Sequence, residues 1–441
     1  MMTFDEAKRV LAANGQEQVL RFWKQLKPSQ RKALLSQIES LDFPMLTRMR
    51  GLLEPSEAIP QEDPVAPEVV EWTPELYAKA LRVGEKELAN GRVAVLLVAG
   101  GQGSRLGFDG PKGAFPIGPL TDQPLFYFHA RKVLALSKRY QARVPFYIMT
   151  SDVNHAATVA CFQKNRFFGL PPEDVIFFVQ GMLPALDQDG KIMLDRPDHI
   201  FLSPDGHGGT LTALAKNGCL ADMKARGIRS IFYFQVDNPM VEIADPAFIG
   251  LHALEKAEIS LKLVAKRDPH EGVGMVVKRG PVFSMIEYSE LTEEQATRRK
   301  SNGDLYFKYG SVAIHVFSRA FLERESKKKL PLHIAHKKVP YVADDGTIVK
   351  PGAPNACKFE KFIFDVLPDA KRVLNLAFDR AEEFSPVKNA EGVDSPASCR
   401  HDLQAKWRRW AGIPEDSPIP IEIDPAYART AEELREKGIR L

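Results

Sequence analysis

The chain has 441 residues, with 60 Lys and Arg residues against 57 Asp and Glu residues and a formal net charge of +3 at pH 7. Hydrophobic residues make up 44% of it, which is typical of a globular protein and excludes disorder over most of the length. A chain of this length has room for two or three domains. Because the basic surplus that binds phosphate backbones is missing, we expect no nucleic-acid partner.

Cysteine spacing and hydropathy exclude two more classes. The longest apolar run, residues 93–99, is far shorter than the ~20 residues that span a bilayer, so we expect no membrane partner. The first ten residues carry acids where a signal peptide has an apolar core, so we expect a cytoplasmic protein. The four cysteines lie far apart and form no CxxC pair, so they suggest neither a zinc site nor a disulfide framework. They are Cys161, Cys219, Cys357 and Cys399. No protein partner can be inferred from the sequence.

The first fifty residues alternate charged and apolar side chains at helical spacing, and Thr3 with Glu6 forms a capping-box pattern. Residues 54–74 then hold five prolines among acids and small residues, a composition that favours extended, solvated chain. We therefore expect residues 1–74 to form an N-terminal helical region followed by a linker.

A short helix is predicted over residues 74–88, with a stop signal at Asn90-Gly91. Short β-rich apolar runs then alternate with helical stretches of 10–20 residues, which predicts βαβ units. The expected fold class is α/β, a Rossmann-like mixed and mainly parallel sheet, with ligands bound at the carboxyl ends of its strands. The predicted strands are 93–98, 144–149, 175–179, 230–236 and 259–264, and the clearest helices are 125–140 and 211–225.

From about residue 272 the pattern changes to hairpin-like strands, at 274–277, 282–288 and 311–317, which predicts a mixed extension of the sheet. Two further helical patterns follow residue 396, with three prolines between them. The expected catalytic domain is 75–390, and residues 391–441 are expected to form a small C-terminal helical region.

A glycine-rich loop follows the first predicted strand, as Ala-Gly-Gly-Gln-Gly-Ser-Arg-Leu-Gly over residues 99–107 with Pro-Lys-Gly at 111–113. Glycines there allow backbone N–H groups to approach a phosphate, which Arg105 and Lys112 can neutralise. A Walker A loop would need Gly-Lys-Ser/Thr, and a dinucleotide fingerprint would open a helix, whereas Pro111 and its neighbours break one. The loop therefore predicts a triphosphate site of another kind, with a plain glycine-rich turn as the alternative.

The stretch LLVAGGQGSRLG…PKG resembles the signature of nucleotidyltransferases that make sugar nucleotides. Other segments are similar to one branch, the UTP-dependent sugar-1-phosphate pyrophosphorylases of the eukaryotic UDP-N-acetylglucosamine pyrophosphorylase type. These segments are YIMTSD, VIFFVQGMLPALDQDGKI, SPDGHGGTLTAL, VDNP, EGVGMVV, IEYSEL, NGDLYFKYGSVAIHVFSRAFL, PNACKFEKFIFD and EEFSPVKN. The resemblance covers roughly residues 90–410 and implies a nucleotidyltransferase fold of the GT-A-like type.

The reaction that the resemblance implies joins UTP and a sugar 1-phosphate, either N-acetylglucosamine-1-phosphate or glucose-1-phosphate, into UDP-sugar and pyrophosphate. Displacement between two anions needs positioning and charge neutralisation rather than a protein nucleophile. Two alternatives stay open: a glycosyltransferase that consumes UDP-sugar, and a catalytically silent UDP-sugar-binding protein. Against the first, the metal site of such enzymes typically carries Asp-x-Asp, whereas this strand ends in Asp237-Asn238-Pro239.

The resemblance also implies roles for individual residues. Asp237 is the expected ligand of Mg²⁺, although Asp-Asn before Pro is by itself typical of a turn after a strand. The expected catalytic residues, which hold the leaving pyrophosphate or the α-phosphate, are Arg105, Lys112 and Lys388. The expected nucleotide-binding residues are Gly100, Gly101, Gln180, Gly206 and Lys358, with the Gln180 amide at the uracil edge.

The implied sugar contacts are His207, Gly274, Glu287 and Ser311, although Glu287 by itself is typical of an exposed strand carboxylate. Relatives that favour N-acetylhexosamine usually carry Asn at the positions of His207 and Ser311. Ser311 is shorter than Asn and cannot offer an acetamido group the same paired donor and acceptor. We therefore expect a weak or reversed preference for the N-acetylated sugar, unless water fills the gap.

Overall fold

The computed structural model describes residues 2–54, 63–414 and 416–438. Contacts divide these residues into two units: unit 1 holds 2–54, 181–209 and 330–363, and unit 2 holds 63–180, 210–329, 364–414 and 416–438. Each unit is therefore assembled from segments far apart in the sequence. The domain boundaries expected after residues 74 and 390 stay a prediction.

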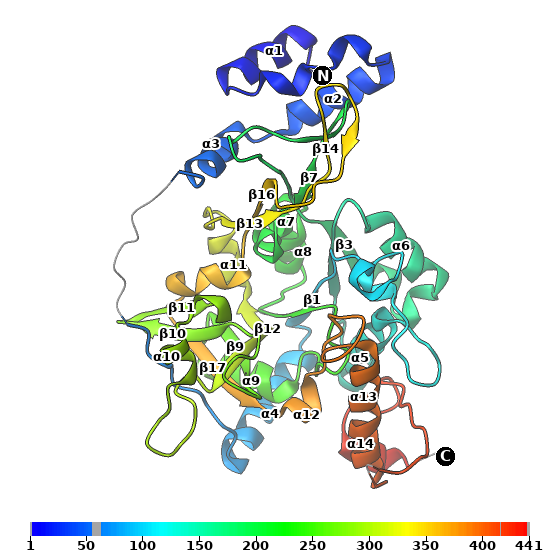
Figure 1. The fold of residues 1–441 in the computed structure, drawn as a ribbon. Helices are drawn as coiled ribbons and strands as arrows, with labels where there is room; N and C mark the ends of the chain where they lie inside the picture. The colour runs from blue at the N-terminus through cyan, green and yellow to red at the C-terminus, as the bar shows by residue number, and fades with distance from the viewer. Residues whose placement is uncertain (1, 55–62, 415, 439–441) are drawn as a thin grey trace. The chain divides into compact units, whose positions relative to one another are not determined.

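Unit 2 is built around a mixed sheet in the order β17-β9-β12-β8-β1-β2-β3, seven strands among the residues described (Figure 1). Its strands are β1 (Val93–Val98), β2 (Phe146–Thr150), β3 (Val175–Val179), β8 (Ser230–Gln235), β9 (Ile259–Ala265), β12 (Tyr309–Ser318) and β17 (Val373–Phe378). The expectation that all the later strands extend this sheet is wrong for β10 (Met275–Arg279) and β11 (Val282–Ile286), which pair with each other as a separate hairpin. Only β12 runs antiparallel to its neighbours within this described sheet. The mainly parallel α/β sheet predicted from the sequence is confirmed.

Helices complete unit 2. They are α4 (Pro74–Ala89), α5 (Leu125–Tyr140), α6 (His155–Lys164), α7 (Thr210–Lys216), α8 (Cys219–Ala225), α9 (Pro246–Leu254), α10 (Glu293–Thr297), α11 (Arg319–Glu325), α12 (Arg380–Glu383), α13 (Pro396–Ala411) and α14 (Ala431–Lys437). The single helix predicted over 211–225 is wrong, because Gly218, at φ +73°, separates α7 from α8. α5 and α13 lie side by side, and the Phe128 and Trp407 rings stack 6.2 Å apart (Figure 1).

Unit 1 consists of the N-terminal helices and several short strands that share one apolar core. Leu11 and Ile38 of the helices and Leu186 and Phe359 of the later segments are all fully buried in it. The predicted N-terminal helices are thus present and pack on two distant parts of the chain. The elements are α1 (Phe4–Ala13), α2 (Pro28–Ser40), α3 (Phe43–Gly51), β4 (Met182–Pro184), β5 (Leu194–Arg196), β6 (His199–Ile200), β7 (Leu202–Pro204), β13 (His333–Lys337), β14 (Tyr341–Val342), β15 (Ile348–Val349) and β16 (Ala356–Glu360).

The proline-rich segment is extended, as predicted, but part of it is bonded to unit 2. The N–H of Val65 donates to the carbonyl of Lys278 on β10, and the N–H of Val70 donates to that of Asn375 on β17. Residues 65–70 therefore differ from the expected free linker in their backbone pairing, although Val65 is still 45% exposed, and residues 55–62 lie outside the described part. Backbone pairing explains the difference, since the edge of a sheet offers unpaired N–H and C=O groups.

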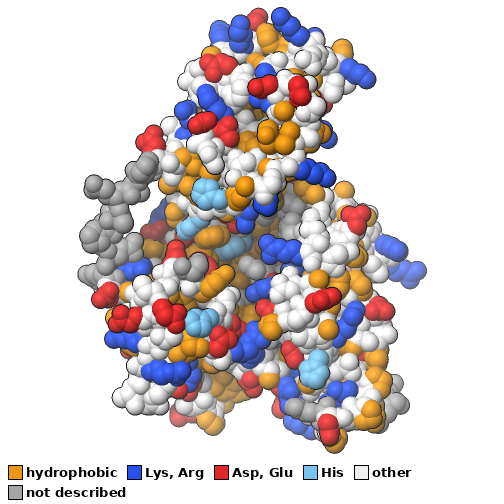
Figure 2. Space-filling model, in the orientation of Figure 1, with side chains coloured by type: hydrophobic (Ala, Val, Ile, Leu, Met, Phe, Trp, Pro, Cys, Tyr) orange, Lys and Arg blue, Asp and Glu red, His pale blue; other side chains and the backbone are white. Residues whose placement is uncertain are grey.

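Among the described residues, the structure contains no helix that is both long and apolar enough to cross a membrane. On the face drawn in Figure 2, basic and acidic side chains are interspersed. This distribution agrees with the near balance of charge in the sequence.

Two buried histidines make folding sensitive to acid. Burial lowers the pKa of His129 and of His252 to about 3, against about 6.5 in an unfolded chain. The unfolded chain therefore binds protons that the folded chain excludes, so stability falls as the pH falls from about 6.5 toward 3. At pH 5 the loss should be roughly 2 kcal/mol for each histidine.

Urea unfolding at pH 7.5 and pH 5 measures this loss. His252 contacts Ser260 Oγ through Nδ1 at 2.8 Å, so His252→Asn keeps a polar atom near that position but does not titrate. The variant should lose less stability than the wild type on acidification. An equal loss in both proteins would show that other groups control the acid response.

Candidate active site

The candidate site lies where two parallel strands of unit 2 end side by side. β1 and β8 pair in register up to Val98 and Gln235, so the loop after β1 and Asp237 after β8 leave the sheet together. The chain runs from β1 to β2 and β3 on one side and then returns to β8 on the other. Such a change of direction opens a crevice at the carboxyl ends of the strands, where α/β proteins bind ligands.

The loop of residues 99–113 folds back on itself as a narrow double strand. The N–H of Lys112 donates to the carbonyl of Gly101 at 3.1 Å, and the N–H of Gly103 donates to that of Gly110 at 2.9 Å. A Cβ on Gly103 would stand 2.8 Å from the Phe108 ring, whereas a Cβ on Gly101 would meet nothing within 4 Å. The backbone at Gly101 is therefore open to a ligand, as the phosphate-site prediction requires.

Two side chains that sequence analysis missed hold this loop from the segment between β2 and α6. Asn154 is fully buried, and its amide donates to the carbonyls of Ala99, at 2.8 Å, and Gly101, at 3.1 Å. The Ser151 hydroxyl donates to the carbonyl of Gly100 at 2.9 Å. Both residues follow β2 directly, so the signal that could have found them is the polar Ser-Asp-Val-Asn stretch at a strand end.

Lys112 and Asp237 face each other across the two strand ends. The Lys112 Nζ lies 3.7 Å from Asp237 Oδ2, and the two side chains are 18% and 15% exposed. A partly exposed pair at this distance is weak and leaves both charges available to a ligand. The Arg105 side chain is exposed on the same loop.

The segment that carries Lys388 lies against the Asp237 backbone. The N–H of Val387 donates to the carbonyl of Asp237 at 2.9 Å, so Lys388 follows one residue after this contact. The Lys388 Nζ stands 5.9 Å from the centre of the Phe384 ring. The structure thus places Lys112 and the backbone beside Lys388 close to Asp237, and the phosphate-binding role of Lys388 stays a prediction.

Gln180 leaves the end of β3, and its N–H donates to the carbonyl of Thr150 at 2.9 Å. A Cβ on Gly100 would stand 3.1 Å from Gln180 Oε1, so the amide packs directly on the glycine loop. The residue is 8% exposed. Two of the predicted nucleotide-binding residues, Gly100 and Gln180, are therefore neighbours.

Gly274, Glu287 and Ser311 also come together, although they lie in different segments. The N–H of Ser311 donates to the carbonyl of Gly274 at 2.7 Å, and a Cβ on Gly274 would stand 3.4 Å from Glu287 Oε1. β12 runs antiparallel to β8 with His315 opposite Tyr233, so the start of β12 lies at the sheet edge where β8 ends. These three predicted sugar contacts therefore share the edge that carries Asp237.

A bulge follows Ser311 within β12. Pairing with β9 shifts between Ser311 and Ile314, and Ala313 adopts φ +58°. Bulges reorient side chains beside functional sites, and this one lies next to the predicted sugar contacts. Nothing in the sequence signals it, because alanine is not typical of this conformation.

The remaining three predicted residues, Gly206, His207 and Lys358, belong to unit 1. Gly206 has φ +83°, and a Cβ on it would stand 2.5 Å from the Lys361 carbonyl oxygen, so only glycine fits. His207 Nδ1 accepts a hydrogen bond from the N–H of Ile363 at 3.1 Å. The Lys358 Nζ lies 4.8 Å from the centre of the Phe201 ring, and burial lowers the pKa of this lysine.

Buried charge fixes the Gly206 loop within unit 1. Asp205 Oδ2 accepts a hydrogen bond from Lys361 Nζ at 3.0 Å, with the two side chains 4% and 10% exposed. Burial raises the pKa of Asp205 even though Lys361 opposes this shift. A Cβ on Gly209 would stand 1.9 Å from Asp205 Oδ1, which explains why the loop carries glycine at that position too.

The donor set at Asp237, a single carboxylate, fits a hard, oxygen-seeking divalent cation such as Mg²⁺. Within the described residues, no group of three or more His, Cys, Asp or Glu side chains is arranged to hold a metal ion. Mg²⁺ commonly binds proteins through one or two carboxylates, with water and substrate phosphates filling its other positions. One partly exposed carboxylate beside a phosphate-binding loop satisfies that requirement.

Comparisons with known proteins agree on one family. The family model for UTP–glucose-1-phosphate uridylyltransferase matches residues 59–406. The chain is 38% identical over 434 residues to UDP-N-acetylhexosamine pyrophosphorylase-like protein 1 of Mus musculus, covering 92% of this chain and 85% of that protein. It is 34% identical over 463 residues to the UDP-N-acetylglucosamine pyrophosphorylase of Saccharomyces cerevisiae, covering 98% of this chain and 96% of that protein.

A solved structure agrees with these relatives. The uridine diphosphate N-acetylglucosamine pyrophosphorylase of Trypanosoma brucei superposes with a TM-score of 0.84 at 26% sequence identity, over 99% of this chain and 95% of that one. The resemblance and the nucleotidyltransferase fold expected from the sequence are thereby confirmed. The chain belongs to the UTP–glucose-1-phosphate uridylyltransferase family.

Proposed function

We propose that the edge formed by β1, β8 and the start of β12 carries Mg²⁺-assisted uridylyl transfer to N-acetylglucosamine-1-phosphate or glucose-1-phosphate. Family membership makes the chain a UTP:sugar-1-phosphate uridylyltransferase. The observation that carries the assignment to this edge is the approach of Lys112 to Asp237, 3.7 Å apart beside an open glycine loop. The comparisons give no support to a glycosyltransferase or a silent binding protein.

The reaction makes one bond and breaks one. A phosphate oxygen of the sugar 1-phosphate bonds to the α-phosphorus of UTP, while the bond from that phosphorus to the bridging oxygen of the β-phosphate breaks. Pyrophosphate leaves with the electron pair, and UDP-sugar remains. Since the attacking oxygen is already anionic, the protein must bring the two anions together and neutralise them rather than remove a proton.

The basic side chains would neutralise the negative charges of the phosphates. Arg105 and Lys112 would hold the β- and γ-phosphates and stabilise the departing pyrophosphate, and Lys388 would hold the α-phosphate. Asp237 would hold the Mg²⁺ ion, which neutralises phosphate charge when bound. Lys112 and Asp237 carry opposite charges, and their weak pairing keeps both side chains at the strand ends without using up either charge.

Residues around the same edge of the sheet would recognise the nucleotide and the sugar. The backbone of Gly100 and Gly101 would approach the nucleotide, and the Gln180 amide would bond the uracil edge. Gly274, Glu287 and Ser311 would contact the sugar hydroxyl groups. For Gly206, His207 and Lys358 of unit 1, the nucleotide and sugar roles stay predictions from the resemblance.

Arg105→Ala should weaken the binding of UTP and pyrophosphate by about 10-fold or more, the loss expected for one charge-assisted contact. UDP-sugar binding should change little, because the product carries no β,γ-pyrophosphate to hold. Calorimetric titrations with the three ligands measure this difference. Arg105 tests the idea more cleanly than Lys112, whose removal also deprives Asp237 of its counter-charge.

Arg82→Ala, which removes an exposed arginine of α4, is the matched control and should leave all three affinities unchanged. Equal losses for UTP and UDP-sugar in Arg105→Ala would mean that the loop serves general docking or folding. Such a result would contradict the pyrophosphate role.

The sugar preference is expected to be weak or reversed in favour of glucose-1-phosphate. Ser311 lacks the amide that would pair with an acetamido group, and each unmade bond costs about 1–3 kcal/mol of discrimination. Ser311→Asn together with His207→Asn should therefore raise the preference for N-acetylglucosamine-1-phosphate. The measurement is kcat/KM for both sugars, from the release of pyrophosphate.

Single variants separate the two positions. Ser311 sits beside Gly274, whereas His207 also accepts a hydrogen bond from the Ile363 backbone, so His207→Asn tests a residue with a second role. A wild-type protein already selective for the N-acetylated sugar, and unchanged by the substitutions, would contradict the hypothesis.

A further inference from the structure

We propose that Lys132 and Lys406 are positioning residues for uridylyl transfer, because their buried ammonium groups fix the backbone that presents Asp237. The proposal rests on the metal-binding role proposed above for Asp237. Lys132 lies on α5 and Lys406 on α13, and neither was singled out by sequence analysis. Both point at the segment of residues 236–241 that follows β8.

Lys132 bonds this segment at residues that follow Asp237 in the chain. Its Nζ donates to the carbonyl of Pro239 at 2.6 Å and to that of Val241, also at 2.6 Å. Lys406 Nζ donates to the carbonyl of Met240 at 3.5 Å and to that of Glu382. Three successive carbonyls just after Asp237 are thus held by two side-chain cations.

The rest of the segment is held as closely. His129, one helical turn from Lys132 on α5, contacts the carbonyl of Val236 through Nε2 at 3.0 Å. The carbonyl of Asp237 accepts from the N–H of Val387. The Asn238 amide donates to the carbonyl of Glu383 at 2.7 Å, and its Oδ1 accepts from the N–H of Ser385 at 3.2 Å. Asp237 is therefore bracketed on both sides by fixed backbone.

Burying two ionisable amino groups is unfavourable, which argues that their contacts serve a purpose. Lys132 and Lys406 are only 8% and 4% exposed. Burial, with the nearby Lys406 charge, lowers the pKa of Lys132 to about 7, and burial also lowers that of Lys406. An apolar side chain of similar length would fill either space without this cost but would leave the carbonyls unpaired.

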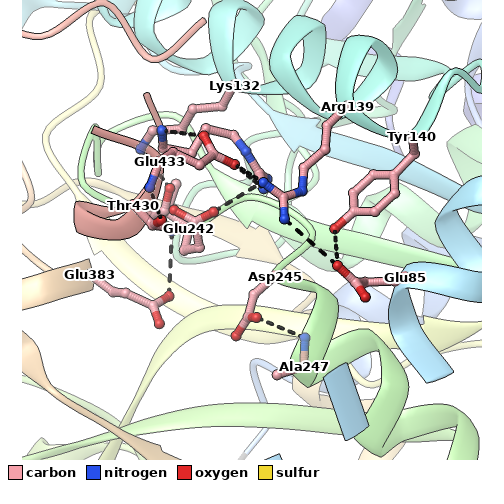
Figure 3. Close-up of polar contacts among 12 residues, drawn as sticks. Glu85, Lys132, Arg139, Tyr140, Glu242, Asp245, Ala247, Glu383, Thr430 and Glu433 are labelled. Atoms are coloured by element: carbon pink, nitrogen blue, oxygen red, sulfur yellow. Dashed lines mark hydrogen bonds and ion pairs between the residues drawn. The ribbon is translucent and has the colours of Figure 1, made fainter. Parts of the chain in front are cut away.

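Acidic groups compensate part of the cost. Glu242 and Glu383 raise the pKa of both lysines and so oppose the effect of burial. Figure 3 shows Lys132 and Arg139 on α5 directed toward the layer of acids that includes Glu242 and Glu433. The N–H of Glu242 donates to Glu383 Oε2 at 3.4 Å, so Glu383 of α12 also bonds the backbone directly after this segment.

Positioning of this kind changes metal binding. Groups that hold a metal ligand in place without touching the ion typically contribute 10–100-fold to metal affinity or activity. Without the Lys132 contacts, residues 237–241 should be more mobile. Asp237 then loses more conformational entropy when it binds a cation, so the cation binds more weakly. The effect should be seen on the metal more than on UTP alone.

The test measures Mn²⁺ binding in the presence of UTP by electron paramagnetic resonance, with Mn²⁺ standing in for Mg²⁺. Lys132→Met and Lys406→Met should each raise the Mn²⁺ dissociation constant 10–100-fold, while metal-free UTP binding changes less than threefold. Turnover should fall and recover in part at high Mg²⁺. Lys138→Met, an exposed lysine on the same helix, should match the wild type. Melting temperatures report whether each variant is folded.

The outcomes separate the two proposals. If Asp237→Asn leaves Mn²⁺ binding unchanged, the assignment of the metal site is wrong. If Asp237→Asn abolishes binding but folded Lys132→Met and Lys406→Met bind Mn²⁺ as the wild type does, the lysines only support the fold and the inference is overturned. If both Met variants unfold, the test uses Lys132→Gln, whose amide can still donate to one carbonyl. A folded Lys132→Gln variant must bind Mn²⁺ measurably more weakly than the wild type, and binding equal to the wild type would overturn the inference.

Discussion

The Asp237→Asn variant should turn over at least a hundredfold more slowly than the wild type at saturating Mg²⁺. The substitution removes the carboxylate charge but keeps the size of the side chain and the backbone carbonyl that accepts from Val387. Because the side chain is 15% exposed and outside the apolar core, the fold should survive. The variant should lose the stabilisation of phosphate charge in the transition state. Removal of one electrostatic group from an active site typically costs about 3–4 kcal/mol of this stabilisation.

Steady-state rates of pyrophosphate release, with melting temperatures alongside, measure this effect. Asp152→Asn is the matched control, since Asp152 is an exposed carboxylate that follows the neighbouring strand β2. It should retain nearly full activity. Undiminished turnover in Asp237→Asn would rule out Asp237 as the metal ligand.

Gly250→Ala should destabilise the protein by roughly 3 kcal/mol or more, the upper range for an overpacked core. Gly250 lies where α9 crosses α4, and a Cβ there would stand 1.8 Å from the carbonyl oxygen of Ala80. On α4, a Cβ on Gly84 would stand 1.7 Å from the Pro246 carbonyl oxygen. The two backbones are in contact, so the helices must move apart to admit even one methyl group.

The direction of this effect distinguishes packing from helix propensity. Alanine in a helix interior is otherwise about 1 kcal/mol better than glycine. Gly51→Ala on α3, where a Cβ would meet nothing within 4 Å, should therefore be neutral or slightly stabilising. Thermal unfolding of both variants gives the comparison. A Gly250→Ala variant as stable as the wild type would contradict the close crossing.

Much of the fold is predictable because the apolar runs and the residues that end helices and strands indicate the same elements. The run Val-Ala-Val-Leu-Leu-Val has no polar face, so it predicts a strand buried on both sides, and β1 is that strand. The predicted end of the preceding helix at Asn90 is likewise confirmed, since α4 ends at Ala89 with Asn90 as its cap. Local chemistry is enough in both cases.

The rest depends on contacts between distant segments. The grouping of residues 181–209 and 330–363 with the N-terminal helices has no local signal, because each segment is a set of short strands that share a core only after folding. The same holds for Asn154, whose role depends on the carbonyls of a loop fifty residues earlier. Lys132 resembles any helix lysine in the sequence, and only its burial shows what it holds.

Transfer of the α-phosphate tests the central claim most directly. The protein is incubated with Mg²⁺, a sugar 1-phosphate and UTP labelled at the α-phosphorus, and the products are separated. We expect all transferred label in UDP-sugar, with an equal amount of unlabelled pyrophosphate, and neither product when the sugar 1-phosphate is omitted. Release of inorganic phosphate in place of pyrophosphate, or absence of label in UDP-sugar for every sugar tested, would contradict the account.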